Sequence, residues 1–267
     1  MSNLVITFGG AAFDVTTAKI VNACAEQGLK LKVYDDRWLT KQKFYEENIR
    51  MFTRQPQHGF GFCCWKPHII QQAFLTMEDG DCLLYVDADT YPVAPLKPLF
   101  DICAREGVVL FEEQGCVNKT WIKEDCFRAM NVPHTLVGVD GHALCDEIRD
   151  GIIACGRFQL YRKGNRTLET LVQEWKIYSL DPRCTFHEGS VDRSTDHPSF
   201  VKNSCEQSVL SVLAAQYKIP LHRTPDQNGW PVSPGCGQPG DDYPLTFIQV
   251  GDRGNLRDWS GSRFANV

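Results

Sequence analysis

Apolar runs and a helix-like segment alternate at the start of the chain. The β-branched run LVITF, residues 4–8, is followed by Gly9 and Gly10 and by a segment from about 16 to 27 with a helical pattern. A second apolar run, LKLKVY, residues 29–34, is followed by Asp35 and Asp36. Short runs of this kind predict strands. The pattern therefore predicts a strand–helix–strand unit, which requires a parallel sheet covered by helices.

A helix followed by a buried strand is predicted further along the chain. The segment CCWKPHIIQQAFLTM, residues 63–77, places Pro67 in a first helical turn and its apolar residues on one stripe. We expect this helix to end at EDGD, where Gly80 suits a left-handed turn. The run CLLYV, residues 82–86, is apolar throughout, which is typical of a strand buried on both faces.

Strands and helices continue to alternate in the second half. GVVLFEE predicts a strand, GIIACGRFQLYRK a pair of strands or one bent strand, and RTLETLVQEWKIYSL an amphipathic helix. Residues 181–204 and 224–244 predict two long loops, which are either lids over a site or plain surface loops. The alternation predicts an α/β fold, namely a three-layer α/β/α sandwich with a mostly parallel central sheet, in a single domain of residues 1–267.

Composition and charge narrow the classes of function. The 267 residues are 43% hydrophobic, enough for a large core, and the net charge of -5 argues against wide contact with nucleic-acid phosphates. The N-terminus lacks a basic region before a long apolar stretch, and no apolar run reaches the roughly 18 residues of a spanning helix. We therefore expect a cytoplasmic protein without a membrane segment. Its twelve cysteines include no CxxC pair and are expected to be reduced thiols.

Two carboxylates, Asp87 and Asp89, follow the predicted buried strand in the sequence YVDADTYP. Residues two apart on an extended chain point the same way, with Cα atoms roughly 6.5 to 7 Å apart. These carboxylates would repel each other beside an apolar strand, and a hard divalent cation removes that cost. Because Mg²⁺ or Mn²⁺ keeps positions open for phosphate oxygens, the pair predicts a metal-bound diphosphate. The alternative is a pair of aspartates that cap a turn or a helix.

Several segments of the chain, in order, resemble the GT-A glycosyltransferases. GFGFCCWKPHIIQQAF and EDGDCLLYVDADTYP are similar to the donor-site region of that family, in particular of a group with a WKPxII helix before a DGDxLLYxDA strand. GIIACGRFQLYRKGNRTLETLVQEW resembles its later strand and helix, CEQSVLSVLAAQYKI its DQS helix, and HRTPDQNG the turn that closes the sheet. The resemblance implies a GT-A fold, with a nucleotide-sugar-binding half at residues 1–110 and an acceptor-side half at residues 111–267.

The resemblance also implies an activity and a cofactor. A sugar would move from a nucleotide-diphosphate sugar to a glycan or other hydroxyl acceptor. Mn²⁺ or Mg²⁺ would bridge the donor diphosphate to Asp89, with Asp87 helping through the metal or the ribose. The family commonly takes a third metal ligand from a C-terminal histidine, for which His222 is the first candidate and His197 the second. The alternative for either is an ordinary surface or hydrogen-bonded histidine.

The ends of the first two predicted strands supply candidates for contacts to the nucleotide. Phe8, Gly9 and Gly10 follow the first strand, where glycine lets a ligand approach the backbone closely. Asp35 follows the second strand, where a carboxylate can accept hydrogen bonds from ribose or base. The alternative for Asp35 is an ordinary turn at the end of a strand.

Further candidates for contacts to donor and acceptor lie beyond the first unit. Trp65 is a candidate for stacking on a base or sugar, and Lys66 for a positive charge beside the phosphates. The alternatives are core packing for the tryptophan and a solvated helix start for the lysine. The family's DQ reads EQ here, at Glu206 and Gln207, which would line the acceptor face of the sugar. If the reaction inverts the anomeric centre, Glu206 or Asp150 would accept the acceptor's proton, whereas Glu206 could equally be a helix cap.

Two other classes of function remain as alternatives. LLYVDADT also resembles the strand and DxD of haloacid-dehalogenase-type phosphatases, and VGDRGNLRD resembles their late acidic motif. There Asp87 would be the nucleophile and Asp89 its acid–base partner. Against this, Tyr91 stands where that pattern has threonine, and a long segment precedes Asp87. The other alternative is a nucleotide-sugar- or glycan-binding protein that keeps the fold without turnover.

Overall fold

The predicted strand–helix–strand unit forms one end of the central sheet. The computed structural model describes residues 2–9, 13–54, 60–132, 141–227 and 243–250. Strand β1 (Asn3–Phe8) pairs in parallel with β2 (Lys30–Tyr34), and α1 (Asp14–Glu26) connects them. On its other side β1 pairs in parallel with β3 (Cys82–Val86), whose five residues are all buried. The predicted unit and the predicted buried strand are therefore confirmed.

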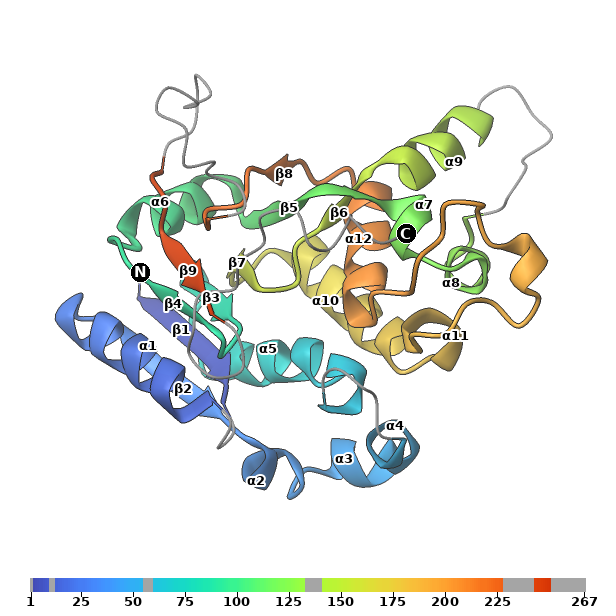
Figure 1. Ribbon diagram of the computed structural model, residues 1–267. Helices are drawn as coiled ribbons and strands as arrows, with labels where there is room; N and C mark the ends of the chain where they lie inside the picture. The colour runs from blue at the N-terminus through green and yellow to red at the C-terminus, as the bar shows by residue number, and fades with distance from the viewer. Residues whose placement is uncertain (1, 10–12, 55–59, 133–140, 228–242, 251–267) are drawn as a thin grey trace.

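The rest of the sheet is mixed. Among the described residues seven strands follow the order β2-β1-β3-β7-β5-β6, with β8 also paired to β5 (Figure 1). The additional strands are β5 (Val108–Val117), β6 (Ile152–Ala154), β7 (Phe158–Arg162) and β8 (Leu221–His222). Strand β7 is antiparallel to both β3 and β5, and β6 is antiparallel to β5. Because β1, β2, β3, β5 and β8 share one direction, the sheet is mostly parallel, as predicted.

The segment GIIACGRFQLYRK forms two strands, as one of its two interpretations predicted. These strands do not pair with each other, because β5 lies between them in the sheet. A separate two-stranded sheet joins β4 (Thr90–Pro92) to β9 (Phe247–Gln249) in antiparallel register. A segment near the end of the described chain thus lies directly beside the DxD sequence.

Helices cover both faces of the sheet and make three layers (Figure 1). One face packs against α1 and α6 (Lys97–Glu106), and the other against α5 (Lys66–Phe74), α10 (Arg166–Ser179) and α12 (Glu206–Gln216). Strand β3 contributes side chains to the core on both faces of the sheet. Leu83 and Tyr85 pack on the side of α5, α10 and α12, and Leu84 and Val86 pack on the side of α1 and α6. This alternation explains why the strand is apolar at every position.

The remaining helices lie in the connections between these elements. They are α2 (Asp36–Leu39), α3 (Lys43–Glu47), α4 (Ile49–Thr53), η2 (Phe60–Cys63), α7 (Asn118–Trp121), α8 (Glu124–Ala129), α9 (Gly141–Asp150), α11 (Pro182–Thr185) and η3 (Arg193–Thr195). Two of them, α11 and η3, lie in the first predicted long loop. Most of the second predicted loop lies outside the described residues. In the described part of the chain no helix combines the length and apolarity needed to cross a bilayer.

Helix α5 ends earlier than the sequence predicted. Its last residue is Phe74, whereas the expected end was the EDGD turn. The hydroxyl of Thr76 donates to the carbonyl of Ala73 at 2.8 Å, and the Thr76 amide donates to the same oxygen at 2.9 Å. That carbonyl would otherwise accept the amide four residues on, so the helical ladder stops there. Gly80 does adopt the predicted left-handed conformation, with φ 95.

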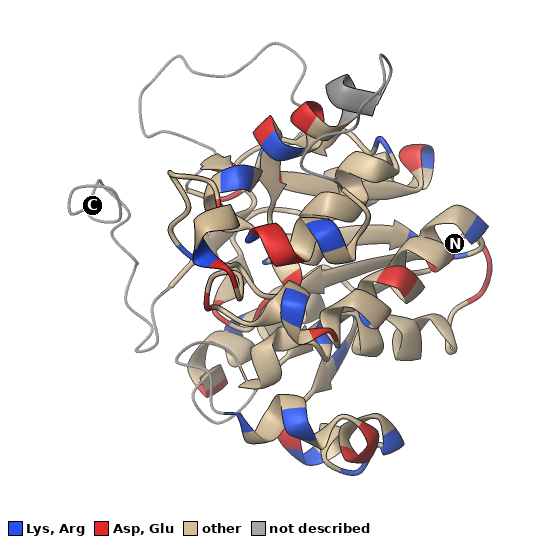
Figure 2. Cartoon of the chain, turned by 90° about the vertical axis from the view of Figure 1, so that its right-hand side faces the viewer, with Lys and Arg blue, Asp and Glu red and all other residues tan. Residues whose placement is uncertain are grey.

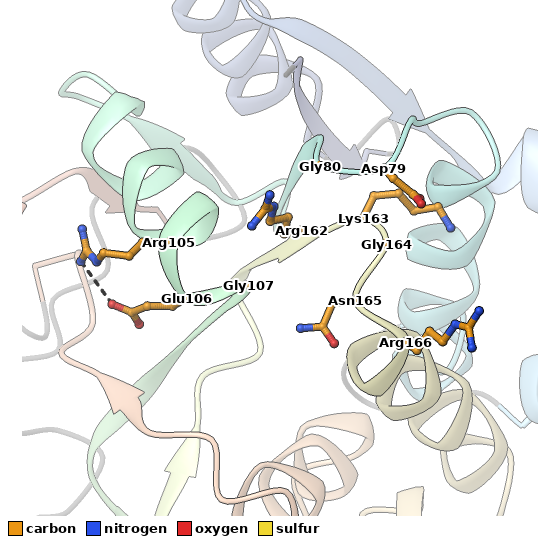
Figure 3. Close-up of a pocket in the computed structure, with 10 residues that line it drawn as sticks. All are labelled: Asp79, Gly80, Arg105, Glu106, Gly107, Arg162, Lys163, Gly164, Asn165 and Arg166. Carbon is orange, nitrogen blue, oxygen red and sulfur yellow. Dashed lines mark hydrogen bonds and ion pairs between the residues drawn. The ribbon is translucent and has the colours of Figure 1, made fainter.

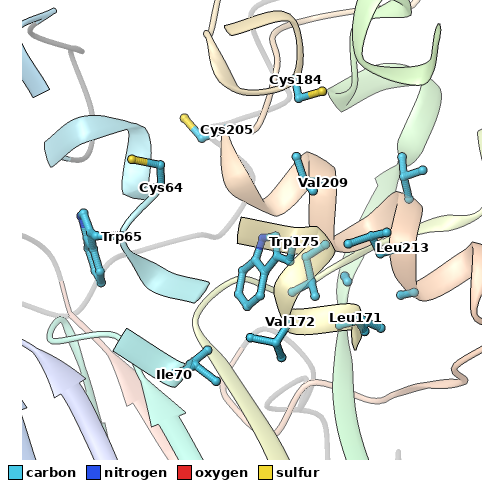
Figure 4. Close-up of a cluster of buried hydrophobic side chains, with 14 of the residues drawn as sticks. Cys64, Trp65, Ile70, Leu171, Val172, Trp175, Cys184, Cys205, Val209 and Leu213 are labelled. Carbon is cyan, nitrogen blue, oxygen red and sulfur yellow. The ribbon is translucent and has the colours of Figure 1, made fainter. Parts of the chain in front are cut away.

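The core between α5, α10 and α12 is built around one tryptophan. Trp175 of α10 is fully buried and lies between Ile70 of α5 and Val209 of α12 (Figure 4). Burying a side chain of this size contributes on the order of 2 to 3 kcal/mol. The tryptophan therefore fixes the spacing of the two helices that begin at Lys66 and Glu206.

Helix α5 also buries His68. Its ring stacks on Phe44 with centroids 4.1 Å apart, and neither ring nitrogen has a hydrogen-bond partner among the described residues. Burial, with a smaller contribution from Lys176, lowers the pKa of His68 from 6.5 to about 4. The unfolded chain therefore binds more protons than the folded one as the pH falls from 6.5 towards 4, and stability is lost over that range.

We expect His68→Phe to remove about 2 kcal/mol of the loss in unfolding free energy that the wild type shows between pH 7 and pH 5. Urea unfolding followed by circular dichroism at the two pH values measures this difference. His197→Phe is the matched control, because His197 is exposed. An unchanged pH dependence in His68→Phe would contradict the interpretation.

Candidate active site

The two aspartates of the DxD sequence lie where the sequence placed them, just beyond the end of β3. Both side chains are partly exposed. The Asp87 amide donates to the carbonyl of Arg157 at 2.7 Å, and the Asp89 carbonyl accepts from the Val250 amide at 2.8 Å. Burial and the neighbouring Asp89 raise the pKa of Asp87, although Lys66 opposes them. The two carboxylates are thus close enough to repel each other.

Lys66 contacts Asp87 and is almost completely buried. Its ammonium donates to the Gly156 carbonyl at 2.8 Å and pairs with Glu206 at 2.7 Å and with Asp87 at 3.2 Å. Burial alone would lower the pKa of Lys66, but Asp87 and Glu206 outweigh it and hold that pKa well above its ordinary value. The three hydrogens of the ammonium therefore have three acceptors inside the protein.

Glu206 is the first residue of α12 and joins this cluster from the other side. Its side chain is 5% exposed, and burial together with Asp87 raises its pKa, although Lys66 opposes them. Trp175 Nε1 donates to the Glu206 carbonyl at 2.9 Å. The Gln207 side chain lies beside Gly156, where an added Cβ would be 3.5 Å from it. Lys66 thus meets Glu206 and Gln207, which lie far from it in the sequence, at the turn that contains Gly156.

Asp87 and Asp89 each receive further hydrogen bonds. The Tyr85 hydroxyl donates to Asp87 Oδ1. Thr90 Oγ1 lies 3.0 Å from Asp89 Oδ1, and Gln249 Nε2 donates to Asp89 Oδ2 at 3.0 Å. Gln249 is on β9, so the two-stranded sheet positions the second aspartate. Sequence reasoning missed Tyr85 and Gln249, because the strand pattern predicts burial and says nothing about partners.

A second buried ion cluster adjoins the first. Arg157, in the turn between β6 and β7, pairs with Glu113 of β5 at 2.7 Å and with Asp226 at 3.0 Å. The Asp226 side chain is fully buried. Sequence reasoning assigned no role to these three residues, although Asp226 lies in the HRTPDQNG segment. Since the backbone of Arg157 also holds the Asp87 amide, the two clusters share one turn.

Among the described residues this region has more carboxylates than cations. Lys66 pairs with two carboxylates and Arg157 with two more, so the described part of each cluster has one more carboxylate than cation. Asp89 adds a further carboxylate. A phosphate ligand would be repelled unless a cation accompanied it.

The nucleotide-contact candidates have structural partners. Phe8 stacks on Trp65 with centroids 3.9 Å apart, and Trp65 is 6% exposed. Asp35 caps α2 by accepting from the Trp38 amide at 2.6 Å. A Cβ on Gly9 would lie 2.7 Å from the Thr17 hydroxyl, so a glycine is needed there for packing. Gly10 lies outside the described residues. These contacts agree with the alternatives of core packing for Trp65 and a turn at the end of a strand for Asp35. Contacts of these residues to a nucleotide stay predictions.

The structure does not bring the remaining candidates to Lys66. Asp150 ends α9 and pairs with Lys119 at 2.6 Å on the surface. His222 lies 2.9 Å from Glu106, on a strand three places from β3 in the sheet order, or roughly 14 Å at the usual strand spacing. His197 is exposed and contacts Ser199 at 2.7 Å.

The carboxylate oxygens of Asp87 and Asp89 are suitable ligands for a divalent cation. Asp87 and Asp89 offer hard oxygen ligands that are partly exposed and mutually repelling, which suits Mg²⁺ or Mn²⁺ completed by phosphate and water. Within the described ranges no group of three or more His, Cys, Asp and Glu side chains is placed to hold a metal. A third ligand from this part of the chain is therefore not assembled, and His222 as that ligand stays a prediction.

Charge elsewhere on the surface is mixed. Basic and acidic residues are interspersed on the face that Figure 2 shows. A depression of about 650 Å³ lies at the other end of β3, beside Gly80, and contains none of the candidate residues (Figure 3). Its charged lining residues are Arg105, Arg162, Lys163, Arg166, Asp79 and Glu106.

Comparison with known proteins gives distant likenesses. No family model and no curated protein matches the chain. Similar solved structures include a glycosyltransferase involved in glycosylation of the major capsid of PBCV-1, with 12% identity, 65% of this chain and 66% of that chain covered, and a TM-score of 0.34. The WbbM bifunctional glycosyltransferase has 9% identity, with 79% of this chain and 37% of that chain covered and a TM-score of 0.44. Mouse xyloside xylosyltransferase 1 has 10% identity, with 85% of each chain covered and a TM-score of 0.42. All three are glycosyltransferases. The chain spans less than two thirds of the first two, and similarities this distant establish neither family nor activity.

The hydrogen bond from Trp175 to Glu206 can be tested directly. We expect Trp175→Phe to lower the unfolding free energy by about 1 to 3 kcal/mol, because it removes a buried donor and part of a ring. Trp121→Phe is the comparison, because Trp121 is partly exposed and its Nε1 has no hydrogen-bond partner within the described chain, so its loss should be smaller. Equal losses in urea unfolding would show that the bond contributes nothing.

Proposed function

We propose that the protein is a metal-dependent glycosyltransferase that moves a sugar from a nucleotide-diphosphate sugar to a hydroxyl acceptor. The observation that carries the proposal is the pair of partly exposed carboxylates, Asp87 and Asp89, at the carboxyl end of a fully buried strand. Ligands of open α/β sheets collect at that end. The GT-A-like segments surround the same point, and their order along the chain supports the proposal.

Asp87 and Asp89 would hold the divalent cation in this reaction. When bound, the cation supplies positive charge beside the leaving diphosphate, where negative charge develops. Tyr85 and Lys66 orient Asp87, and Thr90 and Gln249 orient Asp89. The excess of carboxylates over cations among the described residues of the two ion clusters supports a cation requirement, because it would repel a diphosphate that came without a cation.

Glu206 and Gln207 are the proposed residues on the acceptor side. They begin α12 and meet the turn that contains Gly156, beside the lysine that also holds Asp87. Burial raises the pKa of Glu206 towards the range in which a carboxylate accepts protons effectively. Glu206 is preferred to Asp150 for this role, since Asp150 pairs with Lys119 on the surface.

The metal requirement gives the first test of this function. We expect a nucleoside diphosphate at a hundredfold excess over its Kd to raise the Tm by roughly 5 to 10 °C, and only with Mn²⁺ or Mg²⁺ present. Asp89→Ala should abolish the shift, because it removes a ligand of the cation. Differential scanning fluorimetry with a panel of nucleotide sugars measures the shift and identifies the preferred donor.

Asp101→Asn is the control, because this exposed aspartate pairs with Lys97 on α6. A shift that survives in Asp89→Ala, or that needs no metal, would contradict the proposal. Hydrolysis of a chromogenic phosphate ester that disappears in Asp87→Asn would favour the phosphatase instead. Donor binding without transfer or slow donor hydrolysis, over a broad acceptor screen, would favour a binding protein.

A further inference from the structure

We propose that Lys66 is a positioning residue that holds Asp87 and Glu206 as one unit, and that it does not bind the donor phosphates. The inference rests on the proposed function, because it assigns the lysine a part in that reaction. It also replaces the contact to the donor that the sequence suggested for Lys66. Three observations carry it, namely the hydrogen bonds of the ammonium, its burial, and the backbone of the two segments that build the pair.

The ammonium has no hydrogen left for a phosphate. Its three acceptors are the Gly156 carbonyl at 2.8 Å, Glu206 at 2.7 Å and Asp87 at 3.2 Å. The Lys66 side chain is 3% exposed, whereas the Asp87 side chain, which it contacts, is 29% exposed. Of this pair, Asp87 is therefore the residue that a ligand from solvent can reach.

The acceptors come from three separate parts of the fold. Lys66 begins α5, Glu206 begins α12, and Asp87 follows β3. Gly156 is in the turn between β6 and β7. The ammonium is therefore the point at which two helices, a strand end and a turn are joined. Because both carboxylates bind the same nitrogen, their relative position is fixed by its geometry.

Backbone with positive φ precedes both partners of the ion pair, within a few residues of Lys66 and directly before Glu206. Phe62 and Cys63 have φ 54 and 57, shortly before Lys66, and Cys205 has φ 54 and ψ -136, directly before Glu206. Such conformations are unfavourable for residues with a side chain and persist where the surroundings impose them. Of the described chain's five non-glycine residues with positive φ, these are three.

Packing holds each of these turns in place. Phe62 stacks on Phe186 with centroids 4.6 Å apart, and Trp65 Nε1 donates to the Phe60 carbonyl at 2.9 Å. The thiol of Cys205 lies 3.3 Å from His187. Strain of this kind clusters at sites where groups must be held in place. Its occurrence before both partners of one ion pair supports the inference that the surrounding packing holds Lys66 and Glu206 in place.

The two roles for Lys66 predict opposite effects on binding. A lysine that contacts phosphate would weaken donor binding when removed. A lysine that holds Asp87 and Glu206 together would leave the affinity for Mn²⁺ and donor within about threefold, or tighten that for Mn²⁺, because the site loses a positive charge. Turnover would fall instead, since a misplacement of about 1 Å can cost roughly a hundredfold in rate.

The experiment compares Lys66→Met with the wild type. Calorimetric titration gives the Kd values for Mn²⁺ and for the preferred donor, and donor hydrolysis or transfer gives kcat. We expect kcat to fall by about 100-fold or more, with both Kd values within about threefold or with Mn²⁺ bound more tightly. Arg149→Met is the matched control. It breaks the buried ion pair with Glu124, 2.7 Å long, and should lower the Tm while leaving kcat unchanged.

Lys66→Arg is the second variant and keeps the charge on a longer, planar head. We expect it to fold if Lys66→Met does not, and to lose turnover with little change in donor Kd, because a guanidinium does not reproduce the three contacts. Unchanged kcat in either soluble variant, or a loss confined to donor Kd, would overturn the inference. A wild type that neither binds donor with metal nor turns it over would instead refute the proposed function.

Discussion

The site depends on the contacts of the buried Lys66 ammonium with Gly156, Glu206 and Asp87. An unpaired ammonium at this depth would cost several kcal/mol in lost solvation, so its three acceptors must stay in place whenever the protein is folded. Those acceptors belong to the start of α12, the end of β3 and the turn between β6 and β7. The requirement to satisfy one cation therefore fixes the position of the carboxylates around it. Trp175 also helps to hold the start of α12 in place, through its hydrogen bond to the Glu206 carbonyl.

The direction of β7 makes this cluster possible. Because β7 runs antiparallel to β3, its first residue lies beside the last residue of β3, and Phe158 is paired with Val86. The turn that precedes β7 is thereby brought against Asp87. A parallel strand at this position would place that turn at the other end of the sheet. The antiparallel pairing also places Arg157 between Glu113 and Asp226, so that two ion clusters share one turn.

Two clusters with one cation and two carboxylates each, together with Asp89, give the site its chemical character. Each internal cation is already satisfied by carboxylates, and burial raises the pKa of both Asp87 and Glu206. A site of this kind attracts cations and repels free phosphate. A nucleotide diphosphate accompanied by a divalent ion reconciles the two tendencies, and this is the physical basis of the proposed transfer reaction.

The sequence by itself determined the α/β class, the first strand–helix–strand unit, the buried strand β3 and the two aspartates at its end. Each of these follows from the local period of apolar residues, which is set by how strands and helices bury their faces. The tertiary structure alone decided what Lys66 touches and that β5 lies between β6 and β7. It also decided that Gln249 and Arg157 contact the two aspartates and that Asp226 pairs with Arg157. These contacts join residues up to 160 positions apart. Polar partners at such separations leave no periodic signal, because they depend on how strands are ordered and directed in the sheet.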